Sequence, residues 1–225
     1  MAKVKYSALL ESMRNKLNGS VASRNRYGNY WRNKTSPINR QTEWQTAVRA
    51  QFANNSSAWR GLTASQRESW NAASANFPFT DVFGDQLTLS GNSLYLKLNQ
   101  NLQNMGESTI SEPPLPVAVP DAGSVTVLAT GGTVTVQADG TPGTNGTFMI
   151  YVAANVSPGK QYVKNLYKFI TVEATLGTAV DITTAVEERF GALSTGTAVW
   201  AKVLIGDTTT GQQGQPSSDH TIVAA

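Results

Sequence analysis

Hydrophobic residues recur at helical spacing through the first 106 residues of the chain. In one segment Trp44, Val48 and Phe52 stand at positions i, i+4 and i+8, which is typical of an apolar stripe along one helix face. A period of 3.6 residues predicts four helices in all. They cover residues 7–17, a segment that begins near Asn39, residues 64–76 and residues 91–105.

Short motifs predict where these helices begin and end. Thr63-Ala-Ser-Gln66 fits a capping box, in which the Thr and Gln side chains each satisfy a free backbone amide of the first turn. Ser90 precedes the fourth helix as an N-cap, and Leu94, Leu98, Leu102 and Met105 form its apolar face. We therefore expect these last two helices to be the best defined.

The segments between the predicted helices differ in character. Asn18-Gly19 is interpreted as the C-cap of the first helix. Residues 18–38 show neither a helical nor a strand period and contain two glycines and a proline, which predicts an extended basic arm. Residues 77–89 predict a turn region with a short β-ribbon around Gly84-Asp85.

Beyond residue 107 the pattern changes to short alternating runs of Val, Thr, Ala and Gly. Seven short strands in about 105 residues predict an immunoglobulin-like β-sandwich. Trp200 is the leading candidate for its core aromatic residue, with Val199 and Ala201 as the alternative inward-facing residues. A helical turn is expected at residues 185–190. The predicted strands are 124–128, 133–138, 147–154, 166–175, 178–182, 197–205 and 219–223.

A proline-rich segment separates the two patterns. Residues 107–120 contain four prolines, which favour an extended, semi-rigid spacer. We therefore predict an α+β protein of two domains. A mainly helical domain at 1–106 with the arm at 18–38 is joined by the linker 107–120 to an all-β sandwich of the Ig or fibronectin III type at 121–225.

Charge divides along the same boundary. Residues 1–112 carry 13 basic and 7 acidic side chains, whereas residues 113–225 carry 5 basic and 8 acidic ones. Seven of the basic residues lie between Met13 and Thr42, where no acidic residue occurs. This concentration of positive potential predicts that an acidic partner would be met by the N-terminal part.

Composition excludes several kinds of chemistry. The chain has no cysteine and a single histidine, which rules out disulfide scaffolds, thiolate zinc sites and cysteine nucleophiles. His220 lies in Ser-Ser-Asp-His-Thr, a poor setting for a Ser–His–Asp triad, and Glu187-Glu188 diverge on a helical turn. The glycine-rich segment 140–146 lacks the Gly-Lys-Ser/Thr ending of a phosphate-binding loop. We expect no enzymatic activity, no catalytic residues, no cofactor and no metal.

Targeting and membrane signals are not expected either. The first residues carry two positive charges with no apolar run behind them, unlike a secretory signal. No window approaches the 18 or so apolar residues that a membrane helix needs. We expect no membrane partner.

Arginine and lysine alternate with aromatic residues in the N-terminal part, where four of the five tryptophans precede residue 71. Such a pattern binds single-stranded nucleic acid through phosphate contacts and base stacking, or packs against another protein subunit through cation–π contacts. Packing against protein is the favoured interpretation. The predicted contact residues are Arg24, Arg26, Tyr27, Tyr30, Trp31, Arg32, Lys34, Trp44 and Trp59.

Six sequence blocks occur in a familiar order: Asn18-Gly-Ser20, Arg24-Asn-Arg-Tyr-Gly28, Lys34-Thr-Ser-Pro-Ile-Asn39, Ala58-Trp-Arg-Gly-Leu-Thr63, Gln66-Arg-Glu-Ser-Trp70, and Leu89-Ser-Gly91 with Leu94-Tyr-Leu-Lys-Leu-Asn99. Together they resemble a group of poorly characterised tailed-bacteriophage proteins, over residues 18–106. The resemblance implies a structural role in the virion, as a ring, connector or capsid-attached component around the head–tail neck. It implies no activity.

The C-terminal part is similar to fibronectin type III and related Ig-like domains, which phage virion proteins often carry. Thr210-Gly-Gln-Gln-Gly-Gln-Pro-Ser217 resembles the loop before the last strand of such domains, and Phe190 stands where their corner tyrosine is expected. We therefore expect a homo-oligomer located in the virion. Its partners would be portal, capsid, neck or tail proteins, with packaged DNA as an additional contact. The alternatives are a nucleic-acid-binding protein and, third, a glycan-binding adhesion module.

Overall fold

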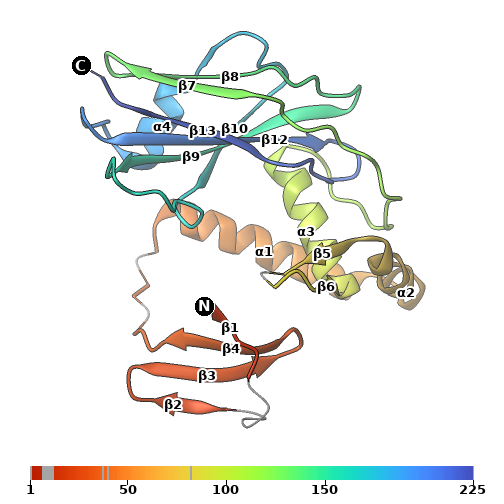
Figure 1. The fold of residues 1–225 in the computed structure, drawn as a ribbon. Helices are drawn as coiled ribbons and strands as arrows, with labels where there is room; N and C mark the ends of the chain where they lie inside the picture. The colour runs from red at the N-terminus through yellow and green to blue at the C-terminus, as the bar shows by residue number, and fades with distance from the viewer. Residues whose placement is uncertain (1, 7–12, 37, 40, 82, 225) are drawn as a thin grey trace.

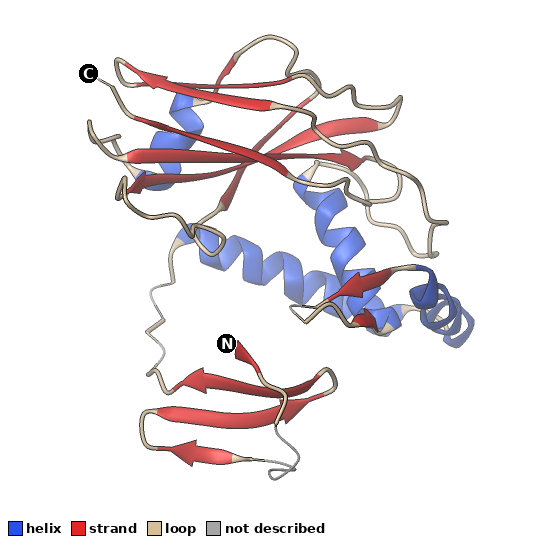
Figure 2. Cartoon of the chain, in the orientation of Figure 1, coloured by secondary structure: helices blue, strands red, loops and turns tan. Residues whose placement is uncertain are grey.

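The computed structural model describes residues 2–6, 13–36, 38–39, 41–81 and 83–224. Helices and antiparallel sheets both contribute, as expected for an α+β protein. Figure 2 shows the helices α1, α2 and α3 between a β-sandwich and a smaller N-terminal sheet. The helices are α1 (Glu43–Gly61), α2 (Ala64–Ala73), the 3-10 helix η1 (Ser74–Asn76), α3 (Gly91–Asn104) and α4 (Thr183–Phe190).

The N-terminal sheet corrects two expectations. It contains β1 (Ala2–Lys3), β2 (Asn15–Leu17), β3 (Ser20–Asn25) and β4 (Gly28–Asn33), in the order β1-β4-β3-β2. Residues 7–12 of the predicted first helix lie outside the described residues, and residues 15–17 form a strand instead. The reason is that Asn18-Gly19 closes a hairpin in which Leu17 pairs with Ser20, as an Asn-Gly dipeptide between strands favours.

The predicted extended arm at 18–38 is, over most of its length, the β3–β4 hairpin. Ala22 pairs with Trp31 and Val21 pairs with Arg32 across an antiparallel ladder. The connecting turn is held by the Tyr27 amide, which donates to Asn25 Oδ1 at 2.9 Å. Backbone hydrogen bonds of the ladder thus replace the solvent-exposed arm that the irregular sequence pattern predicted.

The three central helices pack together, and α3 contacts both α1 and α2. α1 begins at Glu43, later than expected, because Thr42 caps it by accepting from the Gln45 amide at 3.3 Å. The capping box at Thr63 and Gln66 is confirmed at the start of α2. Trp70 of α2 is fully buried against Leu94 and Leu98 of α3.

The β-ribbon expected around residue 84 is confirmed. Strands β5 (Pro78–Thr80) and β6 (Gln86–Thr88) pair in an antiparallel hairpin between α2 and α3. This hairpin lies next to the N-terminal sheet (Figure 1). It is therefore the part of the helical region to which that sheet attaches.

The C-terminal part forms two antiparallel sheets around a shared core. Their strand orders are β11-β8-β7 and β10-β9-β12-β13, and the core contains residues from both, such as Val134, Val136, Phe148 and Ile205. All seven predicted strands are present. Their bounds are β7 (Val125–Thr130), β8 (Thr133–Ala138), β9 (Gly146–Val156), β10 (Lys168–Glu173), β11 (Val180–Asp181), β12 (Ala198–Asp207) and β13 (Ser217–Ile222).

The prediction of Trp200 as a core residue is wrong. Val199 and Ala201 face the core, so the alternation of the strand places Trp200 on the outer face of the sheet. There its ring stacks on His220 with 4.0 Å between ring centroids. When a strand has apolar residues on both of its faces, the sequence does not indicate which face the second sheet covers.

α3 joins the helical region to the sandwich. Leu102 and Met105 pack against Met149 and Leu204 on the outer face of the four-stranded sheet. Asn101 Nδ2 donates to the Gly211 carbonyl at 2.8 Å. A Cβ at Gly211 would collide with the α3 backbone, so only glycine permits this close approach.

The proline-rich segment 107–120 contains no helix or strand. Its chain is nevertheless fixed at several points. Trp70 Nε1 donates to the Ser111 carbonyl at 2.8 Å, and the Ile110 amide donates to Asn99 Oδ1 at 2.7 Å. The segment therefore lies along α3 and the sandwich instead of spanning open solvent.

Candidate assembly surfaces

The β3–β4 hairpin divides the predicted contact residues between two faces. Tyr30 and Arg32 alternate with Trp31 along β4, so Trp31 lies on the opposite face, across from Ala22. In the neighbouring strand Lys16 pairs with Val21, which itself pairs with Arg32. One face of the sheet therefore combines lysine and arginine with tyrosine.

Four further residues of this set lie near the hairpin turn or just after the end of β4, and the last two, Trp44 and Trp59, lie on α1. Arg24, Arg26 and Lys34 are exposed, and Tyr27 is half-buried. The Tyr27 ring contacts Phe79 of β5 edge to face, with centroids 5.8 Å apart. Tyr27 therefore contributes to attachment within the chain, whereas the exposed cations stay available to another molecule.

Two ion pairs complete the attachment of the sheet to the β5–β6 hairpin. Lys3 pairs with Asp81, and Lys5 pairs with Asp85 at 2.8 Å. The hydrogen bond from Lys3 holds the pKa of Asp81 below its usual value. Asp81 Oδ1 also accepts from the Phe83 amide at 2.7 Å, which orders the β5–β6 turn.

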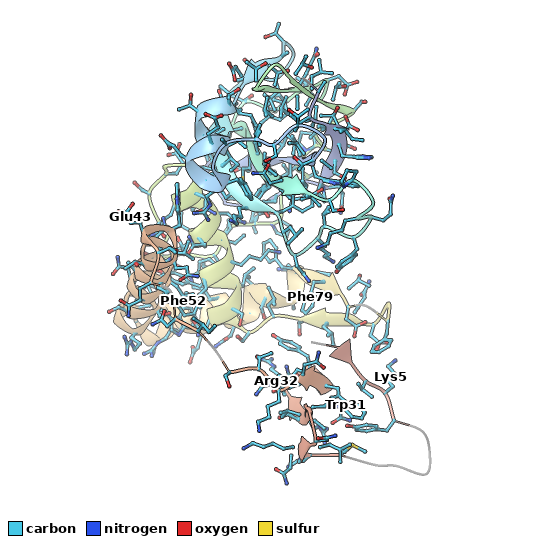
Figure 3. The ribbon with its side chains drawn as sticks, turned by 90° about the vertical axis from the view of Figure 1, so that its left-hand side faces the viewer. Lys5, Trp31, Arg32, Glu43, Phe52 and Phe79 are labelled. Atoms are coloured by element: carbon cyan, nitrogen blue, oxygen red, sulfur yellow. The ribbon has the colours of Figure 1, made fainter. Side chains whose placement is uncertain are left out.

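α1 carries an apolar stripe that α3 covers only in part. Near the C-terminal end Trp59 contacts Tyr95, and Asn55 exchanges two 3.0 Å hydrogen bonds with Gln103. Toward the N-terminal end the stripe extends beyond α3. Trp44, Val48 and Phe52 are 45%, 53% and 57% exposed. Figure 3 shows Glu43 and Phe52 on this helix, and Trp31 and Arg32 on the sheet below it.

The uncovered part of the stripe forms one wall of a groove. The groove has a volume of about 530 Å³ and is lined by Thr42, Trp44, Gln45, Val48, Arg49, Lys168 and Arg189. The Arg189 guanidinium lies over the Trp44 ring at 4.1 Å, and Lys168 Nζ lies over the Phe190 ring at 4.3 Å. We call this feature the basic groove.

The electrostatics of the basic groove are unbalanced. In the described ranges of the chain, no carboxylate lies within 4.0 Å of its cations. Burial, and then the charge of Arg189, lower the pKa of Lys168, and burial lowers the pKa of Arg189. Partly desolvated cations without a carboxylate favour an anionic partner.

The catalytic candidates are not brought together. His220 lies in the edge strand β13, where it stacks on Trp200 of β12. Glu187 and Glu188 are exposed on α4. Over the described part of the chain, no three His, Cys, Asp or Glu side chains are grouped to hold a metal ion. No helix of the described residues is long and apolar enough to cross a membrane.

Tyr162 and Tyr167, the two tyrosines that would serve a glycan-binding sandwich, lie in different surroundings. Tyr162 is exposed in a loop, whereas Tyr167 is half-buried beside Trp200. The Lys202 ammonium lies over the rings of both Tyr151 and Tyr167, at 4.4 Å and 5.3 Å. Tyr151 and Tyr167 thus stabilise the outer face of the sheet through their contacts with Lys202, and Tyr167 also packs beside Trp200.

The basic groove is not predicted by the sequence pattern. Trp44 is among the predicted contact residues, but Lys168 and Arg189 come from β10 and α4, more than a hundred positions further along the chain. No local pattern marks these two residues, because single basic residues on a strand and a helix are ordinary surface residues. Only the tertiary structure brings them beside the N-terminal end of α1.

Comparisons with known proteins give no family. No family model matches the chain, and neither does any curated protein. Among solved structures, it is similar to a β-1,2-glucanase from Parabacteroides distasonis, with 13% identity and a TM-score of 0.33. It is also similar to the chicken interferon gamma receptor alpha chain, with 14% identity and a TM-score of 0.32.

These likenesses are partial in length as well. The glucanase match covers 49% of this chain and 14% of that chain, and the receptor match covers 48% and 46%. Scores of this size carry no conclusion about activity.

Proposed function

We propose that this chain is a non-enzymatic structural component of a bacteriophage virion, a ring, connector or capsid-attached protein at the head–tail neck. It attaches through its N-terminal helices and sheet, and the sandwich projects from the particle. Neighbouring copies and portal, capsid, neck or tail proteins are the partners. The observation that carries the proposal is the row of exposed apolar residues on α1, together with the exposed cations of the N-terminal sheet.

Exposed apolar side chains in a row favour a protein partner. Trp44, Val48 and Phe52 lie on one helix face and leave much of their surface in water. Such patches on a folded chain commonly mark interaction sites, and aromatic anchors dominate the energy of many interfaces. The N-terminal sheet adds exposed cations in the same N-terminal part of the chain, the part whose sequence blocks resemble phage proteins.

We assign the sandwich to the fibronectin type III class of Ig-like domains. The support is its strand order, with a three-stranded sheet β11-β8-β7 against a four-stranded sheet β10-β9-β12-β13. Seven strands in a two-sheet antiparallel sandwich are typical of this class. A module of this kind suits a projecting role because its core is complete within one chain.

The test is localisation in purified particles. Antibody labelling and cryo-electron microscopy of virions that carry the protein are expected to show symmetric copies at the neck or on the capsid. A variant with Val48→Asp and Phe52→Asp is expected to fold but to be absent from particles, because charges replace the apolar contacts. Lys160→Glu, a charge change in an exposed turn of the sandwich, is the matched control and is expected to be incorporated normally. A protein never found in particles would overturn the proposal.

A second candidate function is single-stranded nucleic acid binding by the N-terminal sheet. The observation that favours it is the face that combines Lys16, Tyr30 and Arg32. Binding through phosphates must weaken steeply as salt rises, and Arg32→Ala must reduce the slope of that dependence. Salt-independent or absent binding of oligothymidylate rejects this function.

A further inference from the structure

We propose that copies of this chain associate head to tail, with residues 112–121 of one copy lying in the basic groove of the next. The proposal deepens the structural role proposed above, since it names the contact between copies. It also stands apart from that role, because the contact can be measured on the purified chain without any particle.

The basic groove requires a partner with two properties. Its cations Arg49, Lys168 and Arg189 favour a partner with negative charge. Its exposed Trp44 and Val48 favour a partner with apolar side chains. A free inorganic anion would neutralise the cations but leave the apolar wall in water. An extended protein segment that carries both acidic and apolar side chains satisfies both.

Residues 112–121, here called the acidic strip, have these properties. The sequence is Glu-Pro-Pro-Leu-Pro-Val-Ala-Val-Pro-Asp, with one acidic residue at each end and no basic residue. Glu112 and Asp121 are exposed, and Leu115 and Val117 are 80% and 46% exposed. The strip therefore presents negative charge at both ends and the exposed apolar side chains of Leu115 and Val117 between them.

The acidic strip is already ordered for binding. Gln212, itself buried, donates from Nε2 to the Leu115 carbonyl at 2.7 Å and accepts from the Val117 amide at 2.9 Å. Its prolines restrict the backbone further. Little conformational entropy is then lost on docking, which favours the bound state.

The positions of the two surfaces decide the kind of assembly. In Figure 1 the acidic strip, in yellow-green after α3, lies on the opposite side of the molecule from the N-terminal end of α1, where the groove is. A copy therefore cannot fill its own groove with its own strip. Contacts between two different surfaces are heterologous, and such contacts close into rings or continue as filaments.

The experiment compares a groove variant, Lys168→Glu with Arg189→Glu, and a strip variant, Glu112→Lys with Asp121→Lys, by sedimentation velocity of the full-length chain. Wild type is expected to form species larger than a dimer at low salt and smaller species at high salt. Each variant alone is expected to be monomeric. Lys160→Glu is the matched control and is expected to associate like wild type. Circular dichroism and thermal unfolding check that every variant is folded.

Mixing the two variants gives the sharper result. Each retains one native surface, and the reversed groove and the reversed strip are again opposite in charge, so an equimolar mixture is expected to form species larger than a dimer. A chain with all four reversals is expected to regain the larger species. The proposal is overturned if wild type stays monomeric, if either folded variant associates like wild type, or if the mixture stays monomeric. It is also overturned if oligothymidylate binds a monomeric wild type and loses binding in the groove variant, which would assign the groove to nucleic acid.

Discussion

The sandwich and the N-terminal sheet are both antiparallel, yet they are stabilised in different ways. The sandwich encloses a core of many fully buried residues, among them Phe148, Ile150 and Ile205. Among the described residues of the N-terminal sheet, Ala22 alone is buried. A single sheet without a second layer gains little from burial, so this one depends on its ladder and on its attachment to β5–β6.

The largest expected difference between the two regions appears when one aromatic side chain is removed from each of them. Phe148→Ala leaves a cavity in the sandwich core and is expected to lower the free energy of unfolding by about 3–5 kcal/mol. Trp31→Ala in the sheet is expected to cost much less, because Trp31 is only half-buried. Urea unfolding followed by circular dichroism measures both. Equal losses would contradict the difference between the two regions.

Sequence reasoning succeeded where local chemistry and long-range packing agree. The capping box at Thr63 and the apolar face of α3 predicted two helices, and the alternating runs predicted all seven sandwich strands. These signals are reliable because the same side chains define the element and bury it in the core. Leu98, for example, lies on the helical stripe and is also buried against Trp70.

It failed where one signal has two structural meanings. Asn18-Gly19 ends a helix or closes a hairpin, and Asn18, with a positive φ of 50°, does the latter here. The stripe of Trp44, Val48 and Phe52 was predicted correctly as a helix face, but periodicity does not tell a covered face from an open one. The basic groove depends on residues distant in sequence, so no pattern near Trp44 predicts it.

A smaller effect is expected from a polar contact between the sandwich and the proline-rich segment. Gln212→Ala removes the side chain that bonds both the Leu115 carbonyl and the Val117 amide. The expected loss of unfolding free energy is about 1–3 kcal/mol, because two hydrogen bonds disappear at a buried position. Gln213→Ala is the matched control, since its side chain contacts the Met149 sulfur at 3.3 Å and the Tyr151 hydroxyl, both on the sheet, and not the proline-rich segment. Equal losses of unfolding free energy in the two variants would show that the hydrogen bonds from Gln212 to the proline-rich segment do not stabilise the fold.

The smallest expected effect concerns the attachment of the N-terminal sheet and depends on pH. The pKa of Asp81 is lowered, first by the hydrogen bond from Lys3, from its usual value of 3.8. A lowered pKa means that the folded state favours the charged carboxylate. The contribution to stability is therefore complete above the usual pKa and is lost as the pH falls through the lowered one.

Asp81→Asn isolates this ion pair, because the amide oxygen can still accept from the Phe83 and Asp85 amides. NMR signals of the Tyr27 and Phe79 rings, which touch where the sheet meets β5, report the attachment. In wild type these signals are expected to change as the pH falls below about 4, toward the spectrum of the variant, whose attachment is weaker at neutral pH. None of the buried side chains in the described part of the sandwich titrates in this range, so the methyl signals of Ile150 and Ile205 are expected to stay constant. If the Asn variant shows the same transition as wild type, the attachment does not depend on the charge of Asp81, and the aromatic contact and the backbone ladder must hold the sheet instead.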